Sequence, residues 1–196
     1  MNGPLPPVAP QDAALARAKR GLRAEFARRG ADPALGWRLA GHVLERIPIP
    51  PTAIVSGFWP TDGEIDARPL LLALAGRGHA IVLPRTPGRG LPLGFHLWRP
   101  GVALEAGPHG IAQPPAHAPQ LTPDLLLVPL VAFDAGMRRL GHGGGYYDRT
   151  LALLRAAGKP FALGIAFAAQ RAESLPAGAL DQRLDAVATE RGIISQ

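Results

Sequence analysis

The stretch LLLVPLVAFDAGMRRLGHGGGYYDRTLALLRAAGKPFALGIAF, residues 125–167, decides the fold. It begins with an apolar strand at 125–130, passes through a glycine-rich turn, and predicts a helix over 147–157 and a second apolar strand at 161–167. Strands without polar alternation are typical of a parallel sheet that is covered on both faces. A strand, a helix and a strand in succession build such a sheet.

The rest of the chain continues this alternation. The expected helices lie at 11–29, 36–47 and 66–77, and the expected strands at 53–59 and 80–83. Residues 91–104 predict two short strands, broken at Pro100-Gly101, that pair antiparallel. Residues 106–123 predict a long surface loop, because they are rich in Pro, Gly and His. The sequence therefore predicts an α/β fold: one three-layer α/β/α domain over residues 1–196 with a mainly parallel central sheet, preceded by a disordered Pro-rich segment at 1–10.

For the two N-terminal helices, the sequence also predicts which residues face the body of the domain. On the first, Lys19 lies on the same stripe as Leu15, Leu22 and Phe26. Lys19 therefore either extends its stem along apolar surface with its ammonium exposed, or points at an anion bound between this helix and the body. The residues of the second helix that are expected to face the core are Trp37, Ala40, Val43, Leu44 and Ile47.

Composition narrows the class of protein. The chain has 196 residues, a net charge of +6, 47% hydrophobic residues and no Cys, which excludes a disulfide scaffold, a zinc ribbon and a thiol nucleophile. No apolar run reaches the roughly 18 residues of a membrane span, and no apolar signal segment begins the chain, so we expect a cytoplasmic protein. Aromatic residues are only 6% and the arginines are scattered, which favours an anionic small ligand over nucleic acid.

The turn before the helix at 147–157 is a candidate binding site for a phosphate group. Its four glycines are Gly141, Gly143, Gly144 and Gly145. Backbone without Cβ atoms can bring N–H groups close to a phosphate, the helix N-terminus adds its dipole, and Arg138 or Arg139 adds a full charge. The spacing matches neither the Walker pattern nor the dinucleotide fingerprint, and a flexible turn remains the alternative.

Two carboxylates are placed to serve this turn. Asp148 lies in the first helical turn, where it either interacts with the dipole or holds magnesium. Glu64, in the segment D-G-E-I-D, is either a helix N-terminal charge or a ligand group. The histidines have no metal-ligand spacing, and the serines lack the context of a nucleophile, so zinc and serine hydrolase sites are not expected.

Four motifs in order resemble the 5-formyltetrahydrofolate cyclo-ligase family. They are V-P-L-V-A-F-D with R-L-G-H-G-G-G-Y-Y-D-R-T-L at 128–151, K-R-G-L-R at 19–23, F-W-P-T-D-G-E-I-D at 58–66, and A-F-A-A-Q with L-P and D-Q-R-L-D at 166–185. The likeness spans about residues 13–190. It implies an ATP- and Mg²⁺-dependent, cytoplasmic, monomeric ligase that converts 5-formyltetrahydrofolate, with or without a polyglutamate tail, to 5,10-methenyltetrahydrofolate, ADP and phosphate through a phosphorylated formyl group.

The resemblance also assigns roles to residues. It places ATP at Lys19, Arg20, Gly21, Leu22 and Arg23 and at Arg139, Leu140, Gly141, His142, Gly143, Gly144, Gly145, Tyr146 and Tyr147. It places folate at Trp59, Glu64, Tyr146 and Tyr147, magnesium at Asp148 and Asp181, and catalysis at Arg139, Tyr146 and Asp148. Many members carry Lys where this chain has Gly144, which moves the gripping of phosphate onto Lys19, Arg23 and Arg139. Gln113 replaces a common acidic residue and affects only a peripheral contact.

Two alternatives stay open at this point. One is a paralogue with the same fold that serves another pathway, against which the motifs at Glu64 and Asp181 argue. The other is a nucleotide- or RNA-binding module without turnover, which only the isoelectric point of about 10.9 favours.

Overall fold

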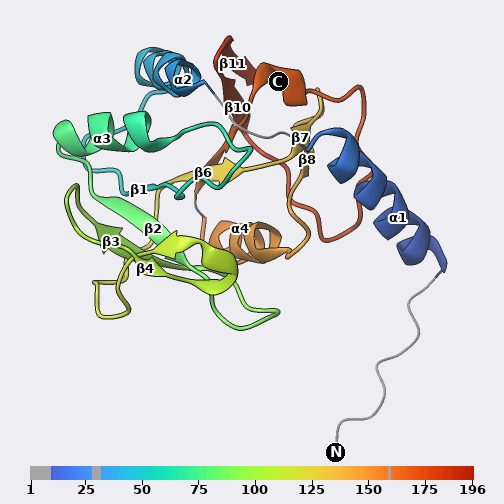
Figure 1. Ribbon diagram of the computed structural model, residues 1–196, viewed down its shortest axis with the longest axis horizontal. Coiled ribbons are helices and arrows are strands. Elements are labelled where there is room, and N and C mark those ends of the chain that lie inside the picture. Colours follow the sequence, from blue (N-terminus) through green and yellow to red (C-terminus); the bar gives the residue numbers. More distant parts are fainter. Residues whose placement is uncertain (1–9, 28–31, 159) are drawn as a thin grey trace, which may run out of the picture.

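The computed structural model describes residues 10–27, 32–158 and 160–196 (Figure 1). The expected disordered segment at 1–9 and the last residues of the first expected helix, 28–29, lie outside the described residues. Pro10, also expected in the disordered segment, instead begins helix α1 (Pro10–Glu25).

The described residues form one main sheet of seven strands in the order β11-β10-β9-β6-β1-β2-β3. These strands are β1 (Val55–Ser56), β2 (Ile81–Arg85), β3 (Gly94–Trp98), β6 (Leu125–Pro129), β9 (Phe161–Ile165), β10 (Ala186–Thr189) and β11 (Gly192–Ser195). The inner pairs β10–β9, β9–β6, β6–β1 and β1–β2 are parallel, while β3 and β11 pair antiparallel at the two edges. The sheet is therefore mainly parallel, as the sequence predicts.

Helices cover both faces of this sheet (Figure 1). On one face, Leu125 and Leu127 of β6 join a buried cluster with α2 (Pro33–Arg46) and α3 (Arg68–Gly76). On the other, Leu126 and Val128 pack with residues of α4 (Tyr146–Ala156). Successive strand residues point to opposite faces, so an uninterrupted apolar strand needs a helical layer on each side. The prediction of a three-layer α/β/α fold is confirmed.

Helix α1 lies beside the sheet rather than over it. Its Leu22 and Phe26 pack against a small buried cluster around the antiparallel hairpin β7 (Ala132–Phe133) and β8 (Arg139–Leu140). A second small pair joins β4 (Glu105–Ala106) to β5 (Ala112–Gln113), and η1 (Pro108–Gly110) and η2 (Ala168–Gln170) are short 3₁₀ turns. Among the described residues, no helix has the length and apolar character that a membrane crossing requires.

The topology sets the place of a ligand crevice. From β1 the chain crosses to β2 on one side, whereas from β6 it crosses to β9 on the other. Ligands of open α/β sheets bind beyond the carboxyl ends of the strands at such a switch point. The segments that leave β1 and β6 at this point are 57–66 and 130–145, which hold two of the four sequence motifs.

Three sequence-based expectations are wrong. Trp37 is 65% exposed and Leu39 is buried in its stead, because α2 turns Gly36 toward Asp66, where a Cβ would lie 2.4 Å from the Asp66 carbonyl oxygen. The two strands expected within 91–104 do not pair with each other. Instead β3 joins β2 and buries Phe95 and Trp98, while the exposed β4 joins β5.

The third expectation concerns the loop at 106–123, which contains η1 and β5 and bonds to the main sheet at Gln120. The residue patterns also predicted no strands after 167, where β10 and β11 complete the sheet.

Candidate active site

The glycine loop, residues 141–145, connects β8 to α4. The sequence suggested that this loop follows the main-sheet strand β6. In the structure, the strand immediately before the loop is instead β8 of the small hairpin. Gly143 has φ of 104° and Gly145, the N-cap of α4, has φ of 65°, a region that side chains with a Cβ adopt at a cost. No side chain caps α4.

The N–H groups of this loop have no acceptor among the residues that the structure describes. Within the described part of the chain, the backbone N–H groups of residues 142–145 donate no hydrogen bond. The first N–H groups of any helix also lack intrahelical acceptors, and they carry the positive end of its dipole. The loop and the start of α4 therefore present a row of unpaired donors, which suits an anion.

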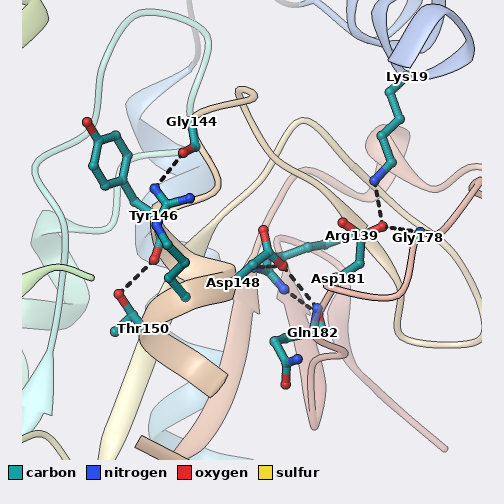
Figure 2. Close-up of polar contacts among 10 residues, drawn as sticks. Lys19, Arg139, Gly144, Tyr146, Asp148, Thr150, Gly178, Asp181 and Gln182 are labelled. Carbon is teal, nitrogen blue, oxygen red and sulfur yellow. Dashed lines mark hydrogen bonds and ion pairs between the residues drawn. The ribbon is translucent and has the colours of Figure 1, made fainter. Parts of the chain in front are cut away.

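A buried arginine lies behind this loop (Figure 2). The Arg139 side chain is 3% exposed, and its Nη2 donates to Asp148 Oδ1 at 2.7 Å while Nη1 donates to the Gln182 carbonyl oxygen. The Gln182 N–H donates to the same Asp148 oxygen at 3.0 Å. Burial lowers the pKa of the Arg139 guanidinium, and Asp148 and Asp181 oppose this shift. A guanidinium remains protonated in proteins, so the pair is ionic.

A second ion pair connects α1 to the C-terminal region. Lys19 Nζ lies 2.5 Å from Asp181 Oδ2, which also accepts the Gly178 N–H at 2.6 Å (Figure 2). Of the two alternatives for Lys19, the ammonium is thus directed inward, to a carboxylate of the body. We call Lys19, Arg139, Asp148 and Asp181 the paired-charge group.

Arg23 joins this group to the glycine loop. Its Nε donates to the Gly141 carbonyl oxygen at 2.7 Å. A Cβ built on Gly143 would lie 3.4 Å from the Arg23 guanidinium carbon. The loop and α1 are therefore in direct contact, although 118 residues separate Arg23 from Gly141.

Two carboxylates of the paired-charge group, Asp148 and Asp181, could hold a magnesium ion. No group of three or more His, Cys, Asp or Glu side chains that could hold a metal ion occurs among the described residues. Mg²⁺ in phosphoryl-transfer sites usually takes one or two carboxylates, phosphate oxygens and water. Asp148 and Asp181 flank the same arginine, and they supply that number of carboxylates.

The second part of the site is the Glu64 loop, residues 57–66, which follows β1. Glu64 Oε2 accepts hydrogen bonds from the N–H and the hydroxyl of Thr61, at 2.7 and 2.9 Å. Its other oxygen lies 3.1 Å from His142 Nε2, which links this loop to the glycine loop. Trp59 is half-buried, packs edge-on against Trp98 at 5.7 Å and lies under the Arg68 guanidinium.

The two tyrosines at the start of α4 differ in surroundings. Tyr147 packs against the core cluster under α4, and burial raises the pKa of its phenol, with a further contribution from Glu64. Tyr146 is half-buried at the surface, where Arg149 stacks on its ring at 5.2 Å. The two tyrosines thus make different contacts, Tyr147 with the core under α4 and Tyr146 with Arg149.

The remaining candidates lie outside this geometry. Arg20 and Gly21 are exposed on α1, Leu22 packs into the cluster beside β7, and Leu140 is buried in β8.

Beside the paired-charge group, a cavity of about 180 Å³ is lined by Arg138, Arg139, Pro176, Ala177, Gly178, Asp181, Gln182 and Arg183.

Four residues with direct contacts to the site received no role from the sequence. Gln182 and Gly178 act through backbone atoms, which leave no signal in side-chain identity. Arg149 and Thr150 lie within the quoted motif, and they bond to Gly144 and Tyr146. Their signal is their position one turn after the glycine loop on α4.

Comparison with known proteins places these features in a family. The model of the 5-formyltetrahydrofolate cyclo-ligase family matches residues 14–190. A protein named 5-formyltetrahydrofolate cyclo-ligase from Escherichia coli is 34% identical over 163 residues, which cover 79% of this chain and 87% of that protein. The protein of that name from Haemophilus influenzae is 33% identical over 69% of this chain and 74% of its own length.

Solved structures agree on the fold. The 5,10-methenyltetrahydrofolate synthetase of Aquifex aeolicus superposes with a TM-score of 0.73 at 24% identity and covers 92% of this chain and 91% of that one. The synthetase of Mycoplasma pneumoniae superposes with a TM-score of 0.67 at 18% identity over 89% of this chain and 98% of that one.

Proposed function

This chain belongs to the 5-formyltetrahydrofolate cyclo-ligase family, a family of ligases, and we propose that it converts 5-formyltetrahydrofolate to 5,10-methenyltetrahydrofolate with ATP and Mg²⁺. The observation that carries the proposal is the glycine loop. Its unpaired N–H donors meet the start of α4 beside two carboxylates and three cations, Lys19, Arg23 and Arg139. Phosphoryl transfer depends on such positioning and charge neutralisation.

The proposed reaction balances as follows. The formyl oxygen of the folate attacks the γ-phosphorus of ATP and ADP leaves, which gives a phosphorylated iminium group. N10 then attacks the formyl carbon, closes the ring and releases its proton to solvent, and inorganic phosphate leaves with the former formyl oxygen. Holding the formyl oxygen in line with the phosphorus removes much of the entropic barrier to the first step.

We assign the two parts of the site to the two ligands. The loop N–H groups, Lys19, Arg23 and Arg139 hold the phosphates, and Asp148 and Asp181 hold magnesium, which would neutralise phosphate charge. The carboxylate of Glu64 suits the N–H donors of a pterin, and Trp59 supplies an aromatic face. We assign Tyr146 to the wall of the folate side. The predicted roles of Arg20, Gly21, Leu22, Leu140 and Tyr147 are backbone or packing contributions to the same loops.

The bond between His142 and Glu64 supports a site that takes both ligands together. It brings the loop assigned to phosphate within 3.1 Å of the loop assigned to the pterin. A nucleotide-binding module without turnover needs no such connection. We further propose that the protein acts on a free small-molecule folate, is located in the cytoplasm and is a monomer.

A coupled assay tests the proposed reaction. The purified protein is mixed with 5-formyltetrahydrofolate, ATP and Mg²⁺, and the near-ultraviolet absorbance of the conjugated product is followed beside ADP release. We expect one ADP per product and no product when any of the three components is omitted. ADP release without the absorbance change would indicate a paralogue with another substrate, and ATP binding without ADP release would indicate a binding module.

A further inference from the structure

The second turn of α4 holds the glycine loop from outside the proposed nucleotide site. Arg149 Nη2 donates to the Gly144 carbonyl oxygen at 2.7 Å, and Nε donates to the Leu91 carbonyl oxygen at 3.3 Å. Its guanidinium also stacks on the Tyr146 ring at 5.2 Å. One side chain thus connects the glycine loop, the first turn of α4 and the segment that precedes β3.

The neighbouring Thr150 fixes the far end of this connection. It is 1% exposed, its hydroxyl donates to the Tyr146 carbonyl oxygen at 2.7 Å, and it accepts the Leu93 N–H at 2.9 Å (Figure 2). Because Thr150 secures Leu93, it also secures the nearby Leu91 carbonyl that receives Arg149. The guanidinium therefore donates to two carbonyls at once, which its rigid fork of donors allows.

Fixing the Gly144 carbonyl has a consequence for the phosphate donors. The C=O of Gly144 and the N–H of Gly145 belong to one planar, trans peptide unit, so they point in opposite directions. A hydrogen bond that holds this carbonyl on the Arg149 side holds the Gly145 N–H on the other. The same relation holds at the other end of the loop, where Arg23 binds the Gly141 carbonyl and so orients the His142 N–H.

The loop needs such external support. Its glycines restrict the backbone least of all residues, two of them have positive φ, and its N–H groups are unpaired within the described residues. An oriented donor stabilises charge only if it need not reorganise when the ligand binds.

We propose that Arg149 is a positioning residue for the nucleotide loop, which orients the Gly145 N–H for phosphate without touching the phosphate itself. This inference rests on the proposed function of the loop. A lysine at position 149 would separate the effect of geometry from that of charge, because it keeps the positive charge but presents a single ammonium in place of the planar fork.

The test compares Arg149→Met and Arg149→Lys with the parent by calorimetric titration with Mg–ATP and, separately, with 5-formyltetrahydrofolate. We expect both variants to bind Mg–ATP about tenfold or more weakly, the equivalent of one lost charge-assisted hydrogen bond, and the folate nearly as the parent does. The matched control is Arg155→Met, which removes the same charge from the same helix at its surface pair with Asp185. It should leave both affinities unchanged.

A second readout does not depend on nucleotide binding. In the parent protein without ligands, we expect NMR order parameters of about 0.85 for the amides of residues 143–145. These values should fall toward about 0.6 in both Arg149 variants and remain unchanged in Arg155→Met. Parental ATP affinity in Arg149→Lys would show that charge alone suffices, and unchanged order parameters would show that the loop needs no support. Either result overturns the inference. A parent that binds no Mg–ATP would contradict the proposed function instead, while the order parameters would still judge the role of Arg149.

Discussion

The paired-charge group and the Glu64 loop both lie beyond the carboxyl ends of the sheet strands, but they are built differently. Lys19 and Asp181 are 162 residues apart, and Arg139 reaches Gln182 from 43 residues away. Glu64, in contrast, takes two of its hydrogen bonds from Thr61, three residues earlier, and a third contact joins it to the distant, exposed His142. The first arrangement exists only when the whole domain is folded, whereas the second is largely a property of one loop.

This difference teaches what a substitution should do in each region. Removing one member of a buried ion pair leaves a charge without its partner, so it lowers stability as well as function. Glu64 is also largely buried, with a side chain 10% exposed, but its two short hydrogen bonds stay within one loop. A replacement of the same size that removes only the charge should therefore change what the loop recognises more than it changes the fold. Stability and ligand affinity measured together therefore separate the two regions.

The largest effect is expected for Arg139→Ala. The variant removes a side chain that is 3% exposed and leaves Asp148 with only the Gln182 N–H. We expect kcat/KM to fall by about 10² or more and the free energy of unfolding to fall by about 3 kcal/mol. Urea unfolding and the coupled assay measure the two quantities. The control Arg155→Ala breaks a surface pair and should cost less than about 1 kcal/mol, and parental turnover in Arg139→Ala would refute its assignment.

Lys19→Ala should affect function about as strongly but stability much less. Its pair with Asp181 is partly exposed, so we expect kcat/KM to fall by about 10² and stability by about 1 kcal/mol or less. The freed Asp181 should bind Mg²⁺ alone more tightly than in the parent, while Mg–ATP binds more weakly. Calorimetry with each ligand measures these opposite changes. Arg17→Ala, an exposed charge on the same helix, is the control; weaker binding of Mg²⁺ alone in Lys19→Ala would argue against Asp181 as a metal ligand.

Glu64→Gln should have the smallest effect on the protein and a selective effect on one ligand. The substitution keeps size and removes charge, so folate affinity should fall about tenfold, as for a lost hydrogen bond to a charged group. ATP affinity and the melting temperature should be nearly unchanged. Calorimetry with each ligand separately is the measurement, and equal weakening of both would place Glu64 outside the pterin site.

The sequence predicted the parts of this molecule whose signal is local. The apolar strands β6 and β9, the helix α4 and the glycine loop between β8 and α4 are found where their residue patterns place them. The stripe of Lys19 with Leu22 and Phe26 also predicted the face of α1 that meets the body. In each case a single segment contains the period or the turn residues that determine it.

The rest depends on partners that a single segment does not contain. Trp37 is exposed because α2 and the residue Asp66 approach at Gly36, which only the packed structure brings together. Strand β3 pairs with β2 rather than within 91–104 because β2 offers a buried sheet edge. The short strand Ala186–Thr189 is rich in Ala, which favours strands weakly, so its place beside β9 supplies most of its stability.

The glycine loop is proposed to bind the phosphates of ATP, and one melting experiment tests this role. Gly143→Val and Gly78→Val both force a branched residue into positive φ, at 104° and 91°, so each should lower stability by about 1–3 kcal/mol. A Cβ at Gly143 also reaches Arg23, whereas one at Gly78 meets nothing within 4 Å. Melting temperatures are measured with and without Mg–ATP, since a ligand that binds the native state raises the midpoint. We predict the full ATP-dependent rise in the parent and in Gly78→Val and none in folded Gly143→Val; a parental rise in Gly143→Val would contradict the phosphate loop and leave a structural turn.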